Sequence, residues 1–195
     1  MLPWVRKGFE SHEGTAAALP ANGSEPRPGV LDAGSGGHLQ ESSEGSRHGG
    51  TLGRPTAPSM RGSCTCGWRG ERTYPLDREH TWPDDRDVHD TSGPKRDWEA
   101  HMEQVAARAV ALPDDLAVLL DQLRDRLDAL LDDAPLTALK AADALESVVA
   151  STGPVAALFL TRAADVLPMA RIAELLGMTE QAAGSRLAHY RHLNR

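Results

Sequence analysis

The chain has 195 residues and a formal net charge of −7, which argues against a protein that coats nucleic acid without specificity. No apolar run approaches the ~20 residues that span a bilayer, and the N-terminus lacks the apolar centre of a signal peptide, so we expect a cytoplasmic protein without membrane contact. The two cysteines, Cys64 and Cys66, are too few for a disulfide framework.

Gly, Ser, Pro and charged residues dominate the first 60 residues, as in the runs Gly34–Gly37 and Ser42–Ser46. Such a segment cannot bury enough apolar surface to offset the entropy lost on ordering. We therefore expect a disordered leader over residues 1–60. The abrupt change in composition at Met60 also suggests that translation starts there and that the preceding segment is a misassigned start.

Residues 61–96 have the composition of a small irregular module, with both cysteines among Gly, Pro and Asp residues. Its apolar residues are too few for a core, so the module needs a metal or a docking partner to be ordered. Cys64 and Cys66 lie two residues apart and point to the same side of an extended chain, so both thiols can bind one ion. A disulfide between them would close a very small, strained ring.

A structural zinc site needs four nitrogen or sulfur ligands, and histidines would supply the other two. His101 is favoured because it lies one helical turn after Trp98 and can be held by that ring. His89 is preferred to His80 because it is nearer to the start of this helix, although the sequence does not decide between them. The predicted zinc site is Cys64, Cys66, His89 and His101, and the alternative is a metal-free module with free thiols.

Amphipathic helices are predicted over residues 97–153, where 4 Lys and Arg residues stand against 12 Asp and Glu residues. The first follows Pro94, the second begins at Asp114 with carboxylates in its first turn, and the third begins at Pro135 and ends at 151–154. Their acidic face is expected to be solvated, or alternatively to dock a basic partner. The Leu-rich second helix could also join two chains into a homodimer. The apolar positions are Trp98, Met102, Val105 and Ala109; Leu116, Leu119, Leu120, Leu123, Leu127, Leu130 and Leu131; and Leu136, Leu139, Ala142, Leu145, Val148 and Val149.

Residues 154–195 show the pattern of two helices joined by a three-residue turn. A helix from Pro154 is broken before a short helix at 169–176. Gly177 can adopt the left-handed conformation of a tight helix exit, and Thr179 can cap the helix that follows. The interior positions are expected to be Ile172, Ala173, Leu176, Met178, Ala183 and Leu187.

This set of residues resembles the C-terminal DNA-binding domain of bacterial sigma factors. The segment is also the one with a net positive balance, 5 Lys and Arg against 3 Asp and Glu. The resemblance implies that the last helix enters the major groove of double-stranded DNA. No upstream region looks able to bind core RNA polymerase, so it implies a regulator rather than a working sigma factor. By position, Thr179, Gln181 and Ser185 would face the groove, and Arg186, Arg191 and Arg171 would contact phosphates.

The element Cys64–Trp68, followed by Trp98 and His101, is similar to the opening of small uncharacterised actinobacterial proteins. That resemblance implies no activity. It supports a bacterial, cytoplasmic setting and a start near Met60.

The sequence contains no glycine-rich phosphate loop, nucleophile elbow or His-Glu-x-x-His pair, so an enzyme is not expected. The predicted fold is mainly α: a helical bundle that ends in a trihelical helix-turn-helix, preceded by an irregular Cys/His module and a disordered N-terminal segment. The predicted function is a DNA-binding transcriptional regulator. The alternative is a protein-interaction module whose acidic face docks a sigma factor or polymerase surface without DNA binding.

Overall fold

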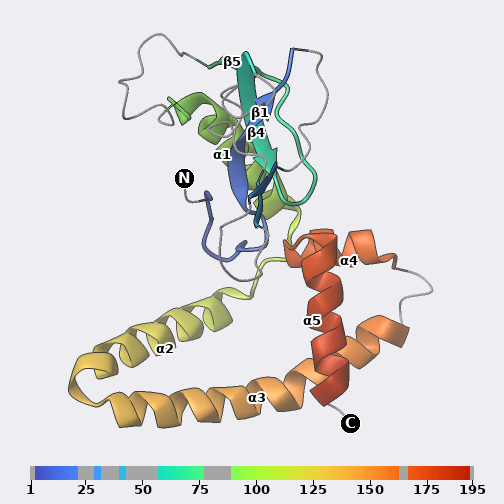
Figure 1. Ribbon diagram of the computed structural model, residues 1–195. Helices are drawn as coiled ribbons and strands as arrows, with labels where there is room; N and C mark the ends of the chain where they lie inside the picture. Colours follow the sequence, from blue (N-terminus) through green and yellow to red (C-terminus); the bar gives the residue numbers. More distant parts are fainter. Residues whose placement is uncertain are drawn as a thin grey trace. The chain divides into compact units, whose positions relative to one another are not determined.

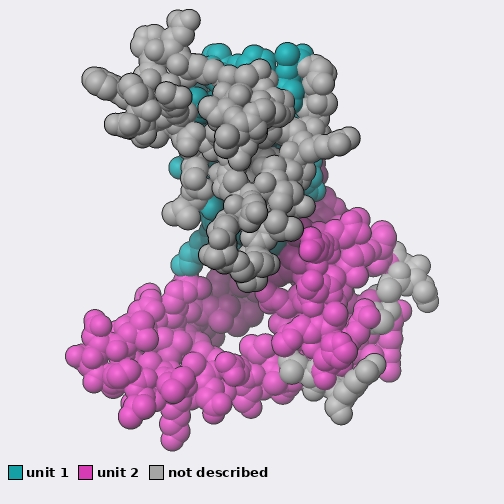
Figure 2. Space-filling model, in the orientation of Figure 1, with its two compact units in different colours: residues 1–107 teal, residues 108–195 magenta. Residues whose placement is uncertain are grey.

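The computed structural model describes residues 3–21, 29–31, 40–42, 57–76, 89–162 and 167–193. The chain divides into two compact units, residues 1–107 and 108–195 (Figure 2). Over the described residues it contains five helices and two small antiparallel sheets, which confirms a mainly helical protein. The division falls inside the predicted acidic helical region 97–153, because the first of its helices belongs to the N-terminal unit.

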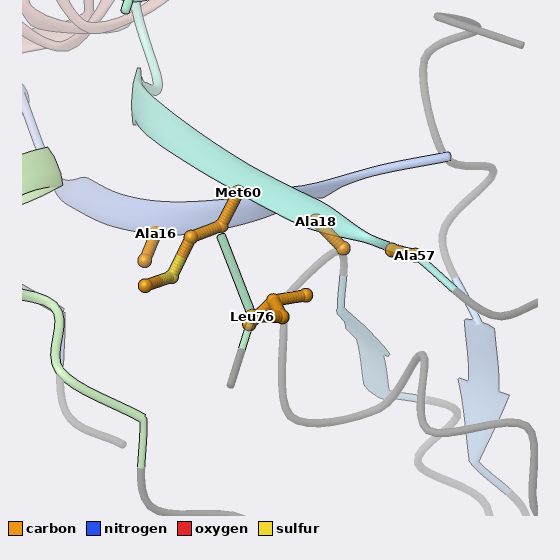
Figure 3. Close-up of a cluster of buried hydrophobic side chains, with 5 residues drawn as sticks. All are labelled: Ala16, Ala18, Ala57, Met60 and Leu76. Atoms are coloured by element: carbon orange, nitrogen blue, oxygen red, sulfur yellow. The ribbon is translucent and has the colours of Figure 1, made fainter. Parts of the chain in front are cut away.

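A three-stranded sheet organises the first unit, with β1 (Gly14–Leu19), β4 (Ser59–Cys64) and β5 (Tyr74–Pro75) in the order β1-β4-β5. β1 pairs with β4 from Gly14 opposite Cys64 to Leu19 opposite Ser59. The strands β2 (Gly29–Leu31) and β3 (Gln40–Ser42) form a separate pair. The side chains buried beside the sheet are small, apart from one Met and one Leu: Ala16, Ala18, Ala57, Met60 and Leu76 (Figure 3).

The prediction of a disordered leader over residues 1–60 is wrong for the part of this segment that the structure describes. Three strands lie in it, and backbone hydrogen bonds in both directions join Trp4 to Gly14, each at 2.8 Å. The run of small residues in β1 packs because its partners, Met60 above all, supply the apolar volume. A chain beginning at Met60 would lack β1 altogether.

Helix α1 (Ser92–Arg108) packs directly on this sheet and buries Pro94, Trp98 and Met102. The predicted spacing of Trp98, Met102 and Val105 is confirmed, since these three residues share one apolar cluster. The close approach depends on glycine, because a Cβ on Gly14 would lie 2.5 Å from Nε1 of the Trp98 indole. The absence of a side chain at Gly14 therefore leaves the space that the Trp98 indole of α1 occupies.

The second unit begins with α2 (Asp114–Asp133) and α3 (Pro135–Arg162), joined by Ala134 alone, where the chain reverses direction (Figure 1). The predicted starts at Asp114 and Pro135 are confirmed. The predicted end at 151–154 is wrong, because α3 continues through Pro154. Proline cannot donate the helical hydrogen bond, yet the hydroxyls of Ser151 and Thr152 both donate back to the Val148 carbonyl at 2.9 and 2.8 Å. The two hydroxyl groups thus form hydrogen bonds within the helix and do not end it.

One described segment, Pro135–Leu160 of α3, is long and apolar enough to cross a membrane by length and composition. No apolar run of this length was expected from the sequence, and three charged residues do stand in the first half of the helix: Lys140, Asp143 and Glu146. A single segment of this kind does not make a membrane protein.

Helices α4 (Met169–Leu176) and α5 (Glu180–Leu193) complete the second unit, with α5 crossing α3 (Figure 1). Ala157 of α3, Ile172 of α4 and Leu187 of α5 form the buried centre of this packing. The partly buried residues around them are Leu160, Leu167, Met169 and Tyr190.

Two glycine-to-alanine changes in the second unit test the packing of α3 on α5. A Cβ on Gly184 would meet nothing within 4 Å, so Gly184→Ala should stabilise the unit by about 1 kcal/mol through helix propensity. A Cβ on Gly153 would lie 2.5 Å from the Tyr190 ring, so Gly153→Ala should destabilise it by about 1–3 kcal/mol. Urea unfolding followed by helical circular dichroism measures both, and equal stabilisation would contradict the packing.

Candidate metal centre and the C-terminal helix pair

Four potential metal ligands converge in the first unit. The ligand atoms of His12, Cys64, Cys66 and His101 all lie within 4.8 Å of one another. The Sγ of Cys64 is 3.6 Å from Nδ1 of His12, and the Sγ of Cys66 is 3.4 Å from Nε2 of His101. The residues come from three segments far apart in the sequence, so the arrangement is a product of the fold.

Thr65, between the two cysteines, fixes the loop that carries His12. Its hydroxyl donates to the Ser11 carbonyl at 2.6 Å and accepts a bond from the Glu13 amide at 3.0 Å. Its own amide donates to the Glu13 carbonyl at 3.0 Å. These three bonds hold the residues on both sides of His12 and place its buried ring against the cysteines.

A tight turn presents the two thiols. The Cys64 amide donates to the Trp68 carbonyl and the Gly67 amide to the Cys64 carbonyl, each at 3.0 Å. Gly67 has a φ of 94°, a left-handed conformation that glycine adopts without strain. Trp68 then stacks on the ring of His101, with centroids 4.5 Å apart and planes 8° apart. The turn thus positions both cysteines and one of the histidines.

The two thiols differ strongly in acidity. The pKa of Cys64 lies at about 2, chiefly because the Cys66 side chain donates a hydrogen bond to its sulfur; burial opposes the shift, and bonds from His101 and His12 add to it. The pKa of Cys66 is raised well above its usual range, because that same bond to Cys64 favours the protonated form and burial acts in the same direction. In the absence of a metal ion, negative charge is thus favoured on Cys64 over Cys66.

The dimensions and chemistry of the cluster fit a tetrahedral metal ion. Zinc–sulfur and zinc–nitrogen bonds of about 2.3 and 2.0 Å place tetrahedral sulfur and nitrogen ligands about 3.5 Å apart. The two observed sulfur–nitrogen distances, 3.6 and 3.4 Å, match this edge. Two thiolates would neutralise a divalent ion, which lowers the penalty for burying it. Thiolate and imidazole ligands suit zinc rather than magnesium or calcium.

The structure brings together three of the four predicted ligands, Cys64, Cys66 and His101, and corrects the fourth. His12 takes the place predicted for His89, which lies outside the cluster. His80, the alternative, lies outside the described residues. His12 was missed because residues 1–60 were treated as one disordered segment, and the alanine-rich run of β1 that follows it gives no apolar signal of a strand.

The C-terminal residues predicted to contact DNA occupy different environments. Gln181, Ser185, Arg186 and Arg191 are exposed on α5. Their helix buries Ala183 and Leu187 on the face toward α3 and α4. Four of the six predicted residues are thus exposed on the last helix, with Gln181 and Ser185 opposite its buried face and the two arginines beside that face.

Thr179 and Arg171 do not fit the predicted roles as well. Thr179 is buried, and its hydroxyl accepts a bond from the Ala182 amide at 3.3 Å, so it caps α5 and does not face outward. Arg171 is exposed but forms an ion pair with Glu174 one turn along α4. The predicted turn is present, with Gly177 left-handed at a φ of 62° and its amide bonded to the end of α4.

Comparison with protein-family models, with curated proteins and with solved structures gives no match for this chain.

Metal binding can be measured with cobalt(II), whose visible absorption develops in tetrahedral thiolate sites. We expect one ion per chain, and His12→Ala should weaken binding roughly tenfold or more because it removes one ligand. His89→Ala is the matched control and should bind as the unchanged chain does. The opposite result, with loss on His89→Ala alone, would restore the ligand set predicted from sequence.

Proposed function

We propose that this chain is a bacterial DNA-binding transcriptional regulator that uses α4, the Gly177–Thr179 turn and α5 as a helix-turn-helix. One observation carries the proposal: the turn and its cap leave one face of α5 packed and the opposite face exposed. Helices α4 and α5 pack with the C-terminal part of α3 as a three-helix unit around Ile172 and Leu187. This is the arrangement in which a recognition helix enters the major groove.

Four exposed residues of α5 have proposed roles that follow from their chemistry. Gln181, one residue into the helix, can pair with the N6 and N7 atoms of adenine, and Ser185 lies one turn further along the same side. Arg186 and Arg191 contact phosphates and set affinity rather than sequence preference. The first amides of α5 attract a phosphate as well.

We propose zinc as the ion of the Cys/His cluster, with a structural role. All four ligands come from the protein, which leaves no open position for substrate or water, so the site does not support catalysis. The role we assign is to hold the His12 loop, the cysteine turn and α1 together. The proposed setting for this non-enzymatic protein is the cytoplasm, where thiols stay reduced.

A second candidate function is docking of a basic protein, such as a sigma factor or a polymerase surface, on α2. The observation in its favour is that all 20 residues of α2 are described and none is buried. Four carboxylates lie on its side away from the leucines, so the helix offers a continuous acidic face: Asp121, Asp125, Asp128 and Asp132.

Selection of duplexes from a randomised DNA pool by the full chain tests DNA binding. The variant Gln181→Ala with Arg186→Ala should lose the enriched motif and bind the selected duplex at least about tenfold more weakly, because it removes one base contact and one phosphate contact. The control, Gln104→Ala with Arg96→Ala, changes exposed residues of α1 and should leave the motif intact. Failure of the folded chain to enrich any motif would favour the docking function.

Zinc removal tests the structural role. All four tryptophans lie before residue 99, so tryptophan fluorescence reports on the first unit alone. Chelation should shift the emission of these residues toward that of exposed indole, while most helical circular dichroism remains because α2 to α5 belong to the second unit. Unchanged emission after complete zinc removal, verified by metal analysis, would contradict a structural ion.

A further inference from the structure

The second unit leaves a long apolar surface open along α3. Ala141, Leu145, Val148, Thr152, Val155 and Phe159 follow one another at alternating intervals of four and three residues, which places them along one side of the helix. Val148, Val155 and Phe159 are 57%, 52% and 64% exposed. The hydroxyl of Thr152 is bonded to the Val148 carbonyl, so the polar group in this seam is satisfied within α3.

α2 carries a second seam with the same spacing. Leu116, Leu120, Leu123, Leu127 and Leu130 again alternate at four and three residues. α3 covers this seam only near the connection at Ala134, so the three later leucines are half-buried, whereas Leu116 and Leu120 remain 42% exposed. The two helices diverge from their connection (Figure 1), so the hairpin has two incompletely covered seams, one on each helix.

We propose that these seams are the interface between two copies of this chain, whose α2–α3 hairpins pack into a four-helix bundle. A seam with a seven-residue repeat is complementary to helices with the same repeat, because each side chain needs a hole of matching spacing. α2 and α3 supply two such helices in every copy. A two-fold axis then lets each hairpin fill the open seams of the other.

The charges beside the seams favour a second copy over a basic partner at this face. The carboxylates of α2 at Asp121, Asp125, Asp128 and Asp132 lie on the side away from the leucines, so they stay in solvent when two hairpins meet. Arg124 and Arg126 lie beside the middle of the leucine seam, and the positions beside the α3 seam are uncharged: Ala142, Ala144, Val149, Ser151, Ala156 and Leu158. The basic residues beside the α2 seam would repel a basic partner there, whereas α3 of a second copy would meet them with uncharged side chains.

Sedimentation equilibrium of the full chain across the micromolar range tests the interface. The unchanged chain should be a dimer, and Leu120→Lys or Val148→Lys should raise the dissociation constant at least tenfold, because each places a charge in an apolar seam. Val118→Lys and Leu136→Lys are the matched controls: they make the same change at exposed apolar positions on other faces of α2 and α3, and should leave the dimer intact.

The possible results separate this inference from the proposed DNA binding, which it does not require. A monomeric unchanged chain, or a dimer weakened equally by seam and control variants, would overturn it. So would a monomer that binds phosphatidylcholine vesicles and loses this binding with Val148→Lys, since the seam would then face lipid. The double variant Gln181→Ala with Arg186→Ala should still sediment with the mass of a dimer. A failure of DNA binding and a failure of dimerisation are therefore distinguishable.

Discussion

The convergence of two thiols and two imidazoles within 4.8 Å is the constraint on which the first unit depends. The core beside it is small, because the buried positions of the sheet are mostly alanine and glycine and only a few large side chains, such as Trp98 and Met102, are buried. A domain of this size with so little buried apolar area is marginal without an additional link. Glycines in the sheet let α1 approach closely, and α1 carries His101. The same close packing therefore also brings His101 to the cysteine turn.

The second unit also has a small buried core, but here we propose a second copy of the chain and not a metal ion as the additional source of stability. Its buried centre comprises little more than Ala157, Ile172 and Leu187, while the leucines of α2 and the valines of α3 remain largely exposed. A metal ion would compensate for the small core of the first unit, and a second copy of the chain would do so for the second. The turn at Gly177 connects α4 to α5, and its left-handed conformation sets the direction in which α5 leaves α4.

Local patterns in the sequence predicted most of the helical structure. The starts at Asp114 and Pro135 and the short helix Met169–Leu176 follow from prolines, first-turn carboxylates and a C-terminal glycine, which act within a few residues. The predicted helix end at 151–154 was wrong, because hydroxyl groups just before a proline can either end a helix or bond back into it. β1 and His12 were missed for another reason: a strand of alanines has no apolar signal of its own, and its order depends on partners more than 40 residues away in the sequence.

The separation of the four ligands along the chain has a kinetic consequence. Cys64 and His12 are 52 residues apart, and Cys66 and His101 are 35 apart, so the cluster closes only after two long-range contacts have formed. Such contacts are slow because the chain loses entropy before they become favourable. During synthesis the His12 loop and β1 leave the ribosome first and must wait for β4 and then for α1. Binding of a metal ion by all four ligands would therefore be a late event in the life of the nascent chain, and until β4 is made the backbone of β1 lacks its hydrogen-bonding partner.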